Sequence, residues 1–186
     1  MDKIKINDKI VFGPVPSRRL GSSVGINNIP PKICSYSCIY CQIGKTYKIT
    51  SDRNTFYKKE DIFECVSSKL KDIHYKGGHV DYLTYVPDGE PTLDIGLGDE
   101  IELLGSLGIK IAVITNSSLL DKEEVREELY KADLVSVKID SIDPEIWKKI
   151  NRPHKSLNIE EIKSGIIEFS MRFKGLLLTE TMAILV

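Results

Sequence analysis

Several features that would assign a protein to a class at once are missing from this sequence. No apolar run reaches the ~18 residues that a membrane-spanning helix needs, and the charged first residues do not form a secretory leader. Neither sign of charge is in excess: 26 basic and 27 acidic residues leave a net charge of -1, so no overall field attracts nucleic acid or anionic lipid. No repeat or linker divides the 186 residues. We therefore expect a soluble, cytoplasmic protein with one domain over residues 1–186, in which residues 1–20 or so form an N-terminal extension.

Cysteine is also scarce, and its placement argues against a disulfide framework. Three of the four cysteines crowd into the segment Cys34-Ser-Tyr-Ser-Cys38-Ile-Tyr-Cys41. Thiols gathered in one short loop, in a sequence without a secretion signal, indicate metal ligation in a reducing compartment. The fourth cysteine, Cys65, falls on the apolar face of a predicted helix, where a cysteine behaves as a small hydrophobic residue.

From about residue 80, the sequence alternates short β-branched runs with longer stretches of helical periodicity, which is typical of βα units on a parallel sheet. An earlier helix is predicted over Lys59–His74, and a short strand over Val24–Asn27 leads into the cysteine segment. Asp121 and Asp143 are predicted to cap two of the later helices. The remaining predicted strands are Val80–Val86, Ile109–Thr115, Leu134–Asp140 and Leu176–Val186, and the helices between them are Gly98–Leu107, Lys122–Lys131, Pro144–Ile150 and Ile159–Phe173.

Polar residues follow three of these strands at the point where each strand ends. They are the segments Asp88–Pro91 and Thr115–Ser118, and the residues Lys138, Asp140 and Ser141. The carboxyl ends of parallel strands gather on one edge of a sheet, and α/β folds bind their ligands there. We expect these polar residues to surround a ligand site.

The spacing CxxxCxxC admits two kinds of metal centre. Three thiolates in one short loop can each bind one iron of a cuboidal [4Fe-4S] cluster, which leaves the fourth iron without a protein ligand. The alternative is a structural zinc site completed by Cys65, His74 or His79. Zinc sites usually pair their ligands as CxxC twice, and no second pair is present, so the spacing favours the cluster. A ferredoxin-like electron carrier is disfavoured because its cluster normally has a fourth cysteine.

With Tyr40 just before the last cysteine, the cysteine segment resembles the signature loop of the radical SAM superfamily. The wider sequence resembles the branch described as wyosine-synthesis-like iron-sulfur oxidoreductases, and the likeness runs over nearly the whole chain. The segments that carry it are Gly13–Gly21, Gly25–Pro31, Cys34–Gln42, Tyr85–Thr92, Ile114–Asn116, Val137–Asp140, Ile150–His154 and Thr179–Met182.

This resemblance implies a fold, two cofactors and a reaction. The fold is an α/β, TIM-type (β/α) barrel of parallel strands, here partial because the sequence stops at Val186 inside what looks like the fifth strand. Cys34, Cys38 and Cys41 would bind a [4Fe-4S] cluster whose open iron binds S-adenosylmethionine. An electron then breaks a carbon-sulfur bond of this cofactor and gives a 5′-deoxyadenosyl radical, which abstracts hydrogen from a substrate.

The resemblance also implies roles for residues around the cluster. Tyr40 would lie against the adenine, and the loop Gly89-Glu90-Pro91 would hold the methionine amino group, with the Glu90 carboxylate facing the ammonium. The alternative for this loop is an ordinary turn with Glu90 in solvent.

Asn116, Lys138 and Asp140 are further candidates for contact with the cofactor. Each can reach a ribose hydroxyl or a carboxylate, and Lys138 and Asp140 lie two residues apart on one face of their strand. Polar residues at strand ends also cap the following helix, a role open to the serines that follow them. The basic residues of the family-like segments, which could contact a substrate phosphate or form a solvated surface, are Arg18, Arg19, Arg152, His154 and Lys155.

The resemblance implies partners as well. The cluster would need an electron donor of the flavodoxin or ferredoxin type. The substrate would be a tRNA base, with activation of a partner protein as the rival; the balanced charge gives tRNA binding no independent support. A zinc- or cluster-stabilised binding module without turnover is the alternative to an enzyme.

Overall fold

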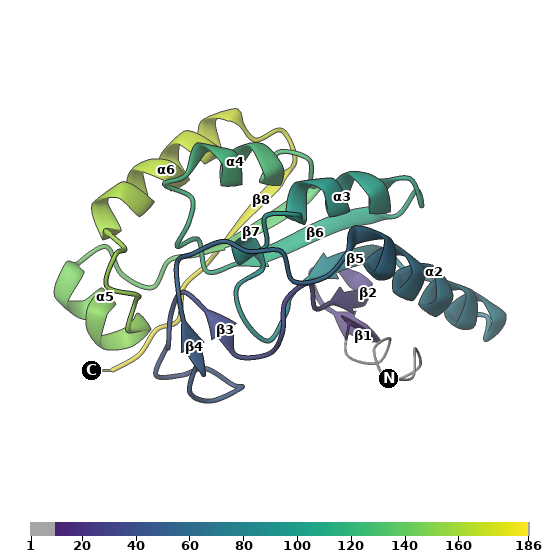
Figure 1. The fold of residues 1–186 in the computed structure, drawn as a ribbon, viewed down its shortest axis with the longest axis horizontal. Coiled ribbons are helices and arrows are strands. Elements are labelled where there is room, and N and C mark those ends of the chain that lie inside the picture. The colour runs from purple at the N-terminus through teal and green to yellow at the C-terminus, as the bar shows by residue number, and fades with distance from the viewer. Residues whose placement is uncertain (1–9, 186) are drawn as a thin grey trace.

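Six strands form one sheet in the computed structural model, which describes residues 10–185 (Figure 1). Their order is β1-β2-β5-β6-β7-β8, and all neighbours are parallel except β1 and β2, which are antiparallel. A separate parallel pair, β3 (Ile33–Cys34) with β4 (Lys48–Ile49), frames the cysteine loop. The strands of the large sheet are β1 (Val11–Ser17), β2 (Gly21–Ile26), β5 (Tyr82–Tyr85), β6 (Lys110–Thr115), β7 (Leu134–Lys138) and β8 (Leu176–Glu180).

The predicted alternation of strand and helix is confirmed, with several strands shorter than expected; the one predicted over Val80–Val86 spans Tyr82–Tyr85. The strand predicted to end at Asp140 ends at Lys138, and the one predicted to reach Val186 ends at Glu180; Val186 itself lies outside the described residues. No helix within residues 10–185 is both long and apolar enough to cross a bilayer. The helices are α2 (Lys59–Tyr75), α3 (Leu97–Gly105), α4 (Glu123–Leu129), α5 (Pro144–Asn151) and α6 (Ile159–Arg172), with a 3-10 turn, η1 (Pro91–Leu93).

Helices pack against one face of the sheet and form the main core with it. Alternate strand residues, such as Leu83 in β5 and Val135 in β7, belong to this core together with apolar side chains of α2, α3, α4 and α6. Cys65 lies on α2 in the same core and is 4% exposed, as the periodicity predicts. It is therefore a packing residue, separate from the cysteine loop.

The opposite face of the sheet is covered in part by the turn between β1 and β2. Leu20, in this turn, packs against Ala112 and Leu134. The neighbouring Arg19 reaches the end of β8, where its Nη1 lies 2.5 Å from Glu180 Oε1. Because β8 is the far edge of the sheet, this contact requires the sheet to curve round, as the sheet of a partial barrel does.

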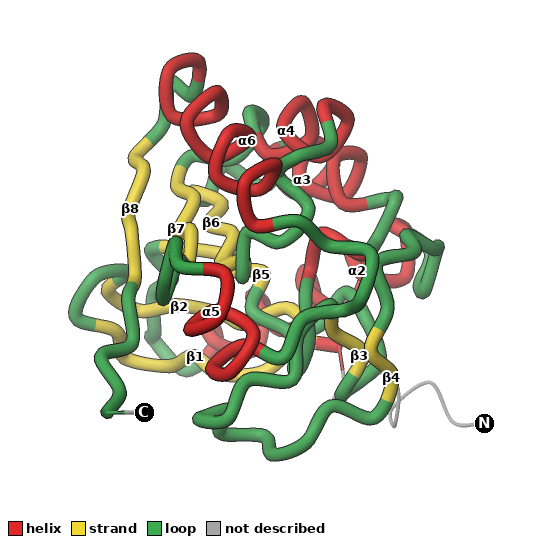
Figure 2. Tube along the Cα trace, turned by 90° about the vertical axis from the view of Figure 1, so that its left-hand side faces the viewer, coloured by secondary structure: helices red, strands yellow, loops and turns green. Residues whose placement is uncertain are grey.

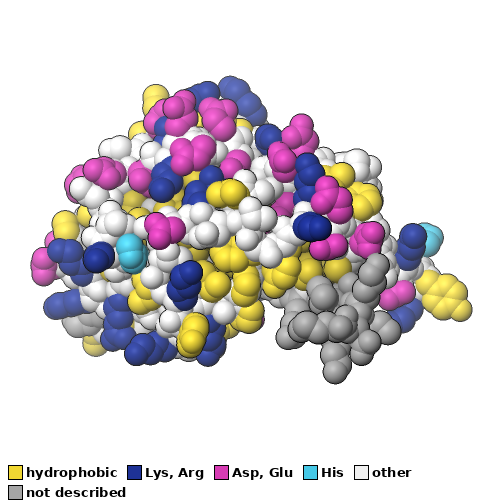
Figure 3. Space-filling model, in the orientation of Figure 1, with side chains coloured by type: hydrophobic (Ala, Val, Ile, Leu, Met, Phe, Trp, Pro, Cys, Tyr) yellow, Lys and Arg dark blue, Asp and Glu magenta, His cyan; other side chains and the backbone are white. Residues whose placement is uncertain are grey.

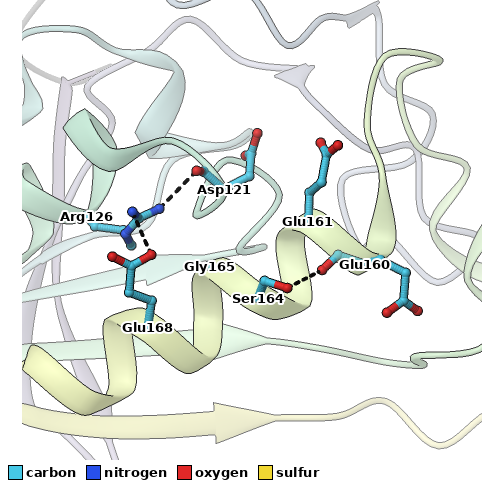
Figure 4. A pocket seen from close by; sticks show the side chains of 7 residues that line it. All are labelled: Asp121, Arg126, Glu160, Glu161, Ser164, Gly165 and Glu168. Atoms are coloured by element: carbon cyan, nitrogen blue, oxygen red, sulfur yellow. Dashed lines mark hydrogen bonds and ion pairs between the residues drawn. The ribbon is translucent and has the colours of Figure 1, made fainter.

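An outer groove of about 410 Å³ lies between α6 and the segment that leads into α4 (Figure 4). Arg126 lines it; one guanidinium nitrogen donates to two main-chain carbonyl oxygens, including that of Asp121 at 2.9 Å, and another lies 2.9 Å from Glu168 Oε2. The helix α4 has Lys122 at its N-cap and no side-chain cap. The predicted capping by Asp121 is therefore wrong, because this stretch of main chain is held by Arg126 instead.

The predicted cap of α5 is confirmed. The Asp143 carboxylate accepts hydrogen bonds from the backbone N–H groups of Glu145 (2.9 Å) and Ile146 (3.0 Å), and Pro144 occupies the first helical position. This cap fixes where α5 begins, and therefore also where its last residue, Asn151, meets the cysteine loop.

Candidate cofactor site

A cavity of about 440 Å³ lies at the carboxyl ends of the parallel strands. Its wall combines the cysteine loop with residues at the ends of β5, β6, β7 and β8. Pro91 and Asp140 are not part of the wall. The other predicted site residues all line it: Cys34, Cys38, Tyr40, Cys41, Gly89, Glu90, Asn116 and Lys138.

Two asparagine amides reach two of the three cysteine sulfurs. Asn116 Nδ2 donates to Cys34 Sγ at 3.4 Å, and Asn151 Nδ2 donates to Cys38 Sγ at 3.4 Å. Asn116 follows β6 and Asn151 ends α5, which lies beside the loops that carry β3 and β4 (Figure 2). Since hydrogen bonds to ligand sulfurs orient them and tune a bound metal centre, the two amides are placed to act on a cluster held by this loop.

Both of these thiols are hard to ionise in the absence of a metal. Burial, followed by the negative charge of Glu90, raises the pKa of Cys34 to about 12. Burial also raises the pKa of Cys38, against the lowering effect of the hydrogen bond from Asn151. A bound iron centre supplies the positive charge that stabilises thiolates, so its binding would release protons.

Glu90 ties the loop after β5 to the loop after β6. It is 1% exposed; Oε1 accepts hydrogen bonds from Thr92 N (3.1 Å), Thr92 Oγ1 (2.7 Å) and Thr115 Oγ1 (2.6 Å), and Oε2 accepts one from Asn116 N (2.7 Å). The alternative of a turn with Glu90 in solvent is therefore wrong. Oε1 is saturated, whereas Oε2 keeps a lone pair for one more donor.

Gly89 allows this loop to pack directly against the strand that carries the first cysteine. A Cβ atom on Gly89 would lie 2.1 Å from the carbonyl oxygen of Ile33, the residue before Cys34. The same oxygen accepts a hydrogen bond from Glu90 N at 3.2 Å. Any side chain at position 89 would therefore displace main chain next to the cysteine.

Asp140 fixes the position of the Tyr40 side chain. The Tyr40 hydroxyl donates to Asp140 Oδ2, and the tyrosine ring lies 4.7 Å from Lys138 Nζ. The Asp140 side chain is fully buried and also accepts hydrogen bonds from Asn151 Nδ2 (2.6 Å) and Met182 N (2.9 Å). The observed role of Asp140 is thus to position Tyr40, and its direct contact with a cofactor stays a prediction. The same holds for Pro91, which is buried at the start of η1.

The side-chain amide of Asn151, which donates to both Cys38 and Asp140, leads to a prediction about stability. We expect Asn151→Leu to lower the free energy of unfolding by about 1–3 kcal/mol, because Asp140 then loses a donor in a buried place. Asn151→Asp should cost at least as much, since it sets a second carboxylate beside the first. Urea denaturation measures both, with Asn158→Asp, which keeps the N-cap of α6, as a control expected within ~0.5 kcal/mol of wild type. An unchanged midpoint for Asn151→Leu would contradict this role.

The zinc alternative gains no support from the described part of the chain. Within residues 10–185, no three His, Cys, Asp or Glu side chains are grouped so as to hold a single metal ion. Cys65 lies in the main core, and His74 and His79 are exposed. The cysteines of a cuboidal cluster bind different irons, so they need not surround one point.

The predicted basic residues divide into two groups. Arg19 pairs with Glu180, and His154 Nδ1 lies within hydrogen-bond distance of Ser51 Oγ (3.1 Å) and of a second serine (2.8 Å), so both side chains have structural partners. The second group has no ion pair within residues 10–185 and is exposed. Its members are Arg18, Arg152 and Lys155.

Among the polar residues of the site that the sequence interpretation missed are Ser136, Asn151 and Glu180. Ser136 donates to Glu180 Oε1 at 3.0 Å, and both line the cavity. Strand alternation places Ser136 on the same face as Lys138, so it could have been found. Asn151 could not, because its distance to the cysteines depends on how α5 packs.

Comparisons with known proteins indicate the family of this chain. A family model described as the radical SAM superfamily matches residues 28–184. A UPF0026 protein of Methanocaldococcus jannaschii is 54% identical over 173 residues, which are 93% of this chain and 53% of the relative. A UPF0026 protein of Synechocystis is 38% identical over 176 residues, which are 94% of this chain and 64% of that relative. The chain thus spans between about half and two thirds of the length of these two relatives.

The fold is also found among solved structures. The structure of TYW1 with a lysine-pyruvate adduct bound matches with a TM-score of 0.59 and 16% identity, and the match covers 88% of this chain and 56% of that one. At this level of identity the match concerns the fold alone. It confirms the predicted α/β fold with a mostly parallel, barrel-like sheet.

Proposed function

This chain belongs to the radical SAM superfamily, and we propose that it is an enzyme that holds a [4Fe-4S] cluster on Cys34, Cys38 and Cys41 and cleaves S-adenosylmethionine reductively. When bound, the two cofactors supply a one-electron cleavage of a carbon-sulfur bond and so a 5′-deoxyadenosyl radical that takes hydrogen from a substrate. One observation carries the proposal: the three cysteines of one loop line a single cavity together with the strand-end loops.

In this proposal, the residues around the cysteines hold the cluster in place. Each cysteine would bind one iron, which would leave the fourth iron without a protein ligand. The amides of Asn116 and Asn151 support the sulfurs of Cys34 and Cys38. The absence of a side chain at Gly89 keeps the loop after β5 close to the first cysteine.

Other cavity residues bind S-adenosylmethionine in the proposal. The free lone pair on Glu90 Oε2 accepts a hydrogen bond from the methionine ammonium. The Tyr40 ring, fixed by Asp140, packs against the adenine, and Lys138 pairs with a carboxylate. Apolar side chains in the wall, among them Val86 and Ile114, limit the access of water to a reactive intermediate.

The proposal includes a setting and partners. An iron-sulfur centre of this kind needs a reducing, cytoplasmic compartment and an electron donor of the flavodoxin or ferredoxin type. We propose a tRNA base as the hydrogen donor, on the strength of the sequence resemblance to the wyosine-synthesis-like branch. Activation of a partner protein is the rival.

Anaerobic reconstitution with iron and sulfide tests the proposal. We expect a brown protein with about four iron and four sulfide per chain. Addition of dithionite and S-adenosylmethionine should then yield 5′-deoxyadenosine, measured by liquid chromatography and mass spectrometry. A colourless protein that retains zinc would contradict the cluster, and a full cluster without 5′-deoxyadenosine would contradict the reaction.

A further inference from the structure

Charge is unevenly distributed over this nearly neutral molecule. Asp and Glu side chains gather over α4 and α6, whereas Lys and Arg side chains gather over α5 and the loops that carry β3 and β4 (Figure 3). We call the second surface the basic face. Its members, all exposed, are Lys32, Lys45, Lys48, Lys149, Arg152 and Lys155.

The basic face is built onto the cysteine loop itself. Lys32 and Lys45 lie two residues before and four residues after the three cysteines. Lys48 lies in β4, which pairs with the strand that ends at Cys34. The other members come from the end of α5 and the residues that follow, where main-chain hydrogen bonds join Ile39 N to Ile150 O (2.9 Å), Ser37 N to Asn151 O (2.9 Å) and His154 N to Ser35 O (2.8 Å).

The cations of the basic face have no ionic partners of their own. None of the ion pairs within residues 10–185 includes one of them. Four of the seven glutamates of α4 and α6, by contrast, pair with Arg53, Arg126, Lys163 and Arg172. The exposed acidic side chains close to the basic face are fewer: Asp52, Asp143 and Glu145 are close in the sequence, and Asp88 is close through the hydrogen bond from Lys32 N to its carbonyl oxygen.

Large apolar side chains are exposed among these cations. Tyr47 is 90% exposed, Ile39 is 42% exposed and Ile49 is 39% exposed. Ile39 lies between two of the cysteines, and Ile49 is the register partner of Cys34 in β4. A surface that mixes unpaired cations with apolar side chains is typical of an interface with another protein.

We propose that the basic face docks an acidic electron-carrier protein, such as a flavodoxin, and that the electron enters the cluster there; this inference rests on the proposed function. The carrier is oxidised by one electron and the cluster is reduced by one electron, with no bond formed or broken and no proton transferred. The location serves this step, because the face consists of the residues that flank the cluster ligands. Weak redox encounters of this kind use small, electrostatically steered interfaces.

The two exposed isoleucines, Ile39 and Ile49, favour a protein over RNA as the occupant. A phosphate backbone is bound by cations and polar groups, and base stacking uses aromatic rings or guanidinium planes. Exposed isoleucines contribute to neither, whereas they contribute directly to contact with a protein.

Charge reversal tests the docking surface. The cluster-loaded chain is mixed anaerobically with a bacterial flavodoxin reduced to its hydroquinone, and stopped-flow absorbance gives the second-order rate constant at about 0.1 M and 1 M ionic strength. We expect Lys48→Glu/Lys149→Glu to lower the rate at least ~10-fold at the lower salt and to approach wild type at the higher salt. The neutral variant Lys48→Gln/Lys149→Gln should give a rate constant between those of wild type and the charge-reversal variant at the lower salt. Lys71→Glu/Lys76→Glu changes the net charge equally at exposed positions on and after α2 and should keep the wild-type rate.

Each contrary result has a distinct meaning. Equal rates for the reversal and its control, at equal cluster content, would overturn the docking surface and leave the proposed function intact. An unchanged flavodoxin rate combined with weaker tRNA retention in filter binding would overturn it in favour of RNA. A wild-type chain without a reducible cluster would contradict the proposed function and, with it, the docking of a donor.

Discussion

Cys34→Ala, Cys38→Ala and Cys41→Ala are each expected to abolish cluster assembly. Every cysteine of the loop is the sole protein ligand of its iron in the proposed site, so no neighbouring side chain replaces it. We expect 5′-deoxyadenosine formation to fall by about 100-fold or more, since even the outer partners of metal sites are worth roughly 10–100-fold. Iron and sulfide content, the visible absorbance and the product assay measure the effect.

Cys65→Ala is the matched control. Cys65 lies on α2 and is 4% exposed in the main core, so we expect a loss of about 1 kcal/mol of stability and an unchanged cluster. Loss of the cluster in this variant would mean that the fourth cysteine belongs to the site, and a full cluster in any of the three loop variants would contradict the ligand set.

Local sequence patterns predicted the helices and strands of this fold better than the residues at which they begin and end. The helix α2 follows from the spacing of its apolar residues, and the cap by Asp143 follows from the proline after it. The strand β1 was not predicted because a glycine and two prolines interrupt it; it is held by pairing with β2, a partner that local periodicity does not reveal. The failed cap at Asp121 has the same origin, since Arg126 takes over that stretch of main chain.

The site shows the same division between local pattern and tertiary packing. The cysteine loop, Glu90 and Asn116 could be predicted because each follows a strand or lies in a short motif. The hydrogen bond from Thr115 to Glu90 and the hydrogen bond from Tyr40 to Asp140 could not be predicted, because each joins elements that lie far apart in the sequence. Sequence therefore identified which residues surround the cavity more readily than how those residues contact one another.

A buried carboxyl pair next to the η1 turn makes the stability of the fold depend on pH. Glu100, in α3, is 1% exposed, and its carboxyl group lies beside the Tyr85 hydroxyl and the Asp94 carboxyl, both of which influence its pKa. Burial, followed by the negative charge of Asp94, raises the pKa of Glu100 to about 9. Burial raises the pKa of Asp94 to about 6. The folded state therefore keeps a proton on Glu100 at neutral pH.

The direction of the pH dependence follows from these shifts. Between the ordinary glutamate pKa of 4.5 and the folded value of about 9, the unfolded chain releases a proton that the folded chain retains. The unfolded state is thus favoured as the pH rises through this window, and the contribution of Glu100 to stability falls. The Asp94 shift acts with the same sign over a lower and narrower range, from 3.8 to about 6.

Glu100→Gln is therefore expected to stabilise the protein at pH 8 by on the order of 2 kcal/mol, because a neutral amide of the same shape has no proton to lose. The gain should vanish near pH 4, where the unfolded glutamate is itself protonated. Urea denaturation from pH 4 to pH 9 gives both curves, and Glu102→Gln, an exposed change on the same helix, should stay within ~0.5 kcal/mol of wild type throughout. A constant difference between wild type and Glu100→Gln at every pH would show that Glu100 is ionised in the folded state, because only a proton held by the fold makes the benefit of the amide grow as the solution becomes more alkaline.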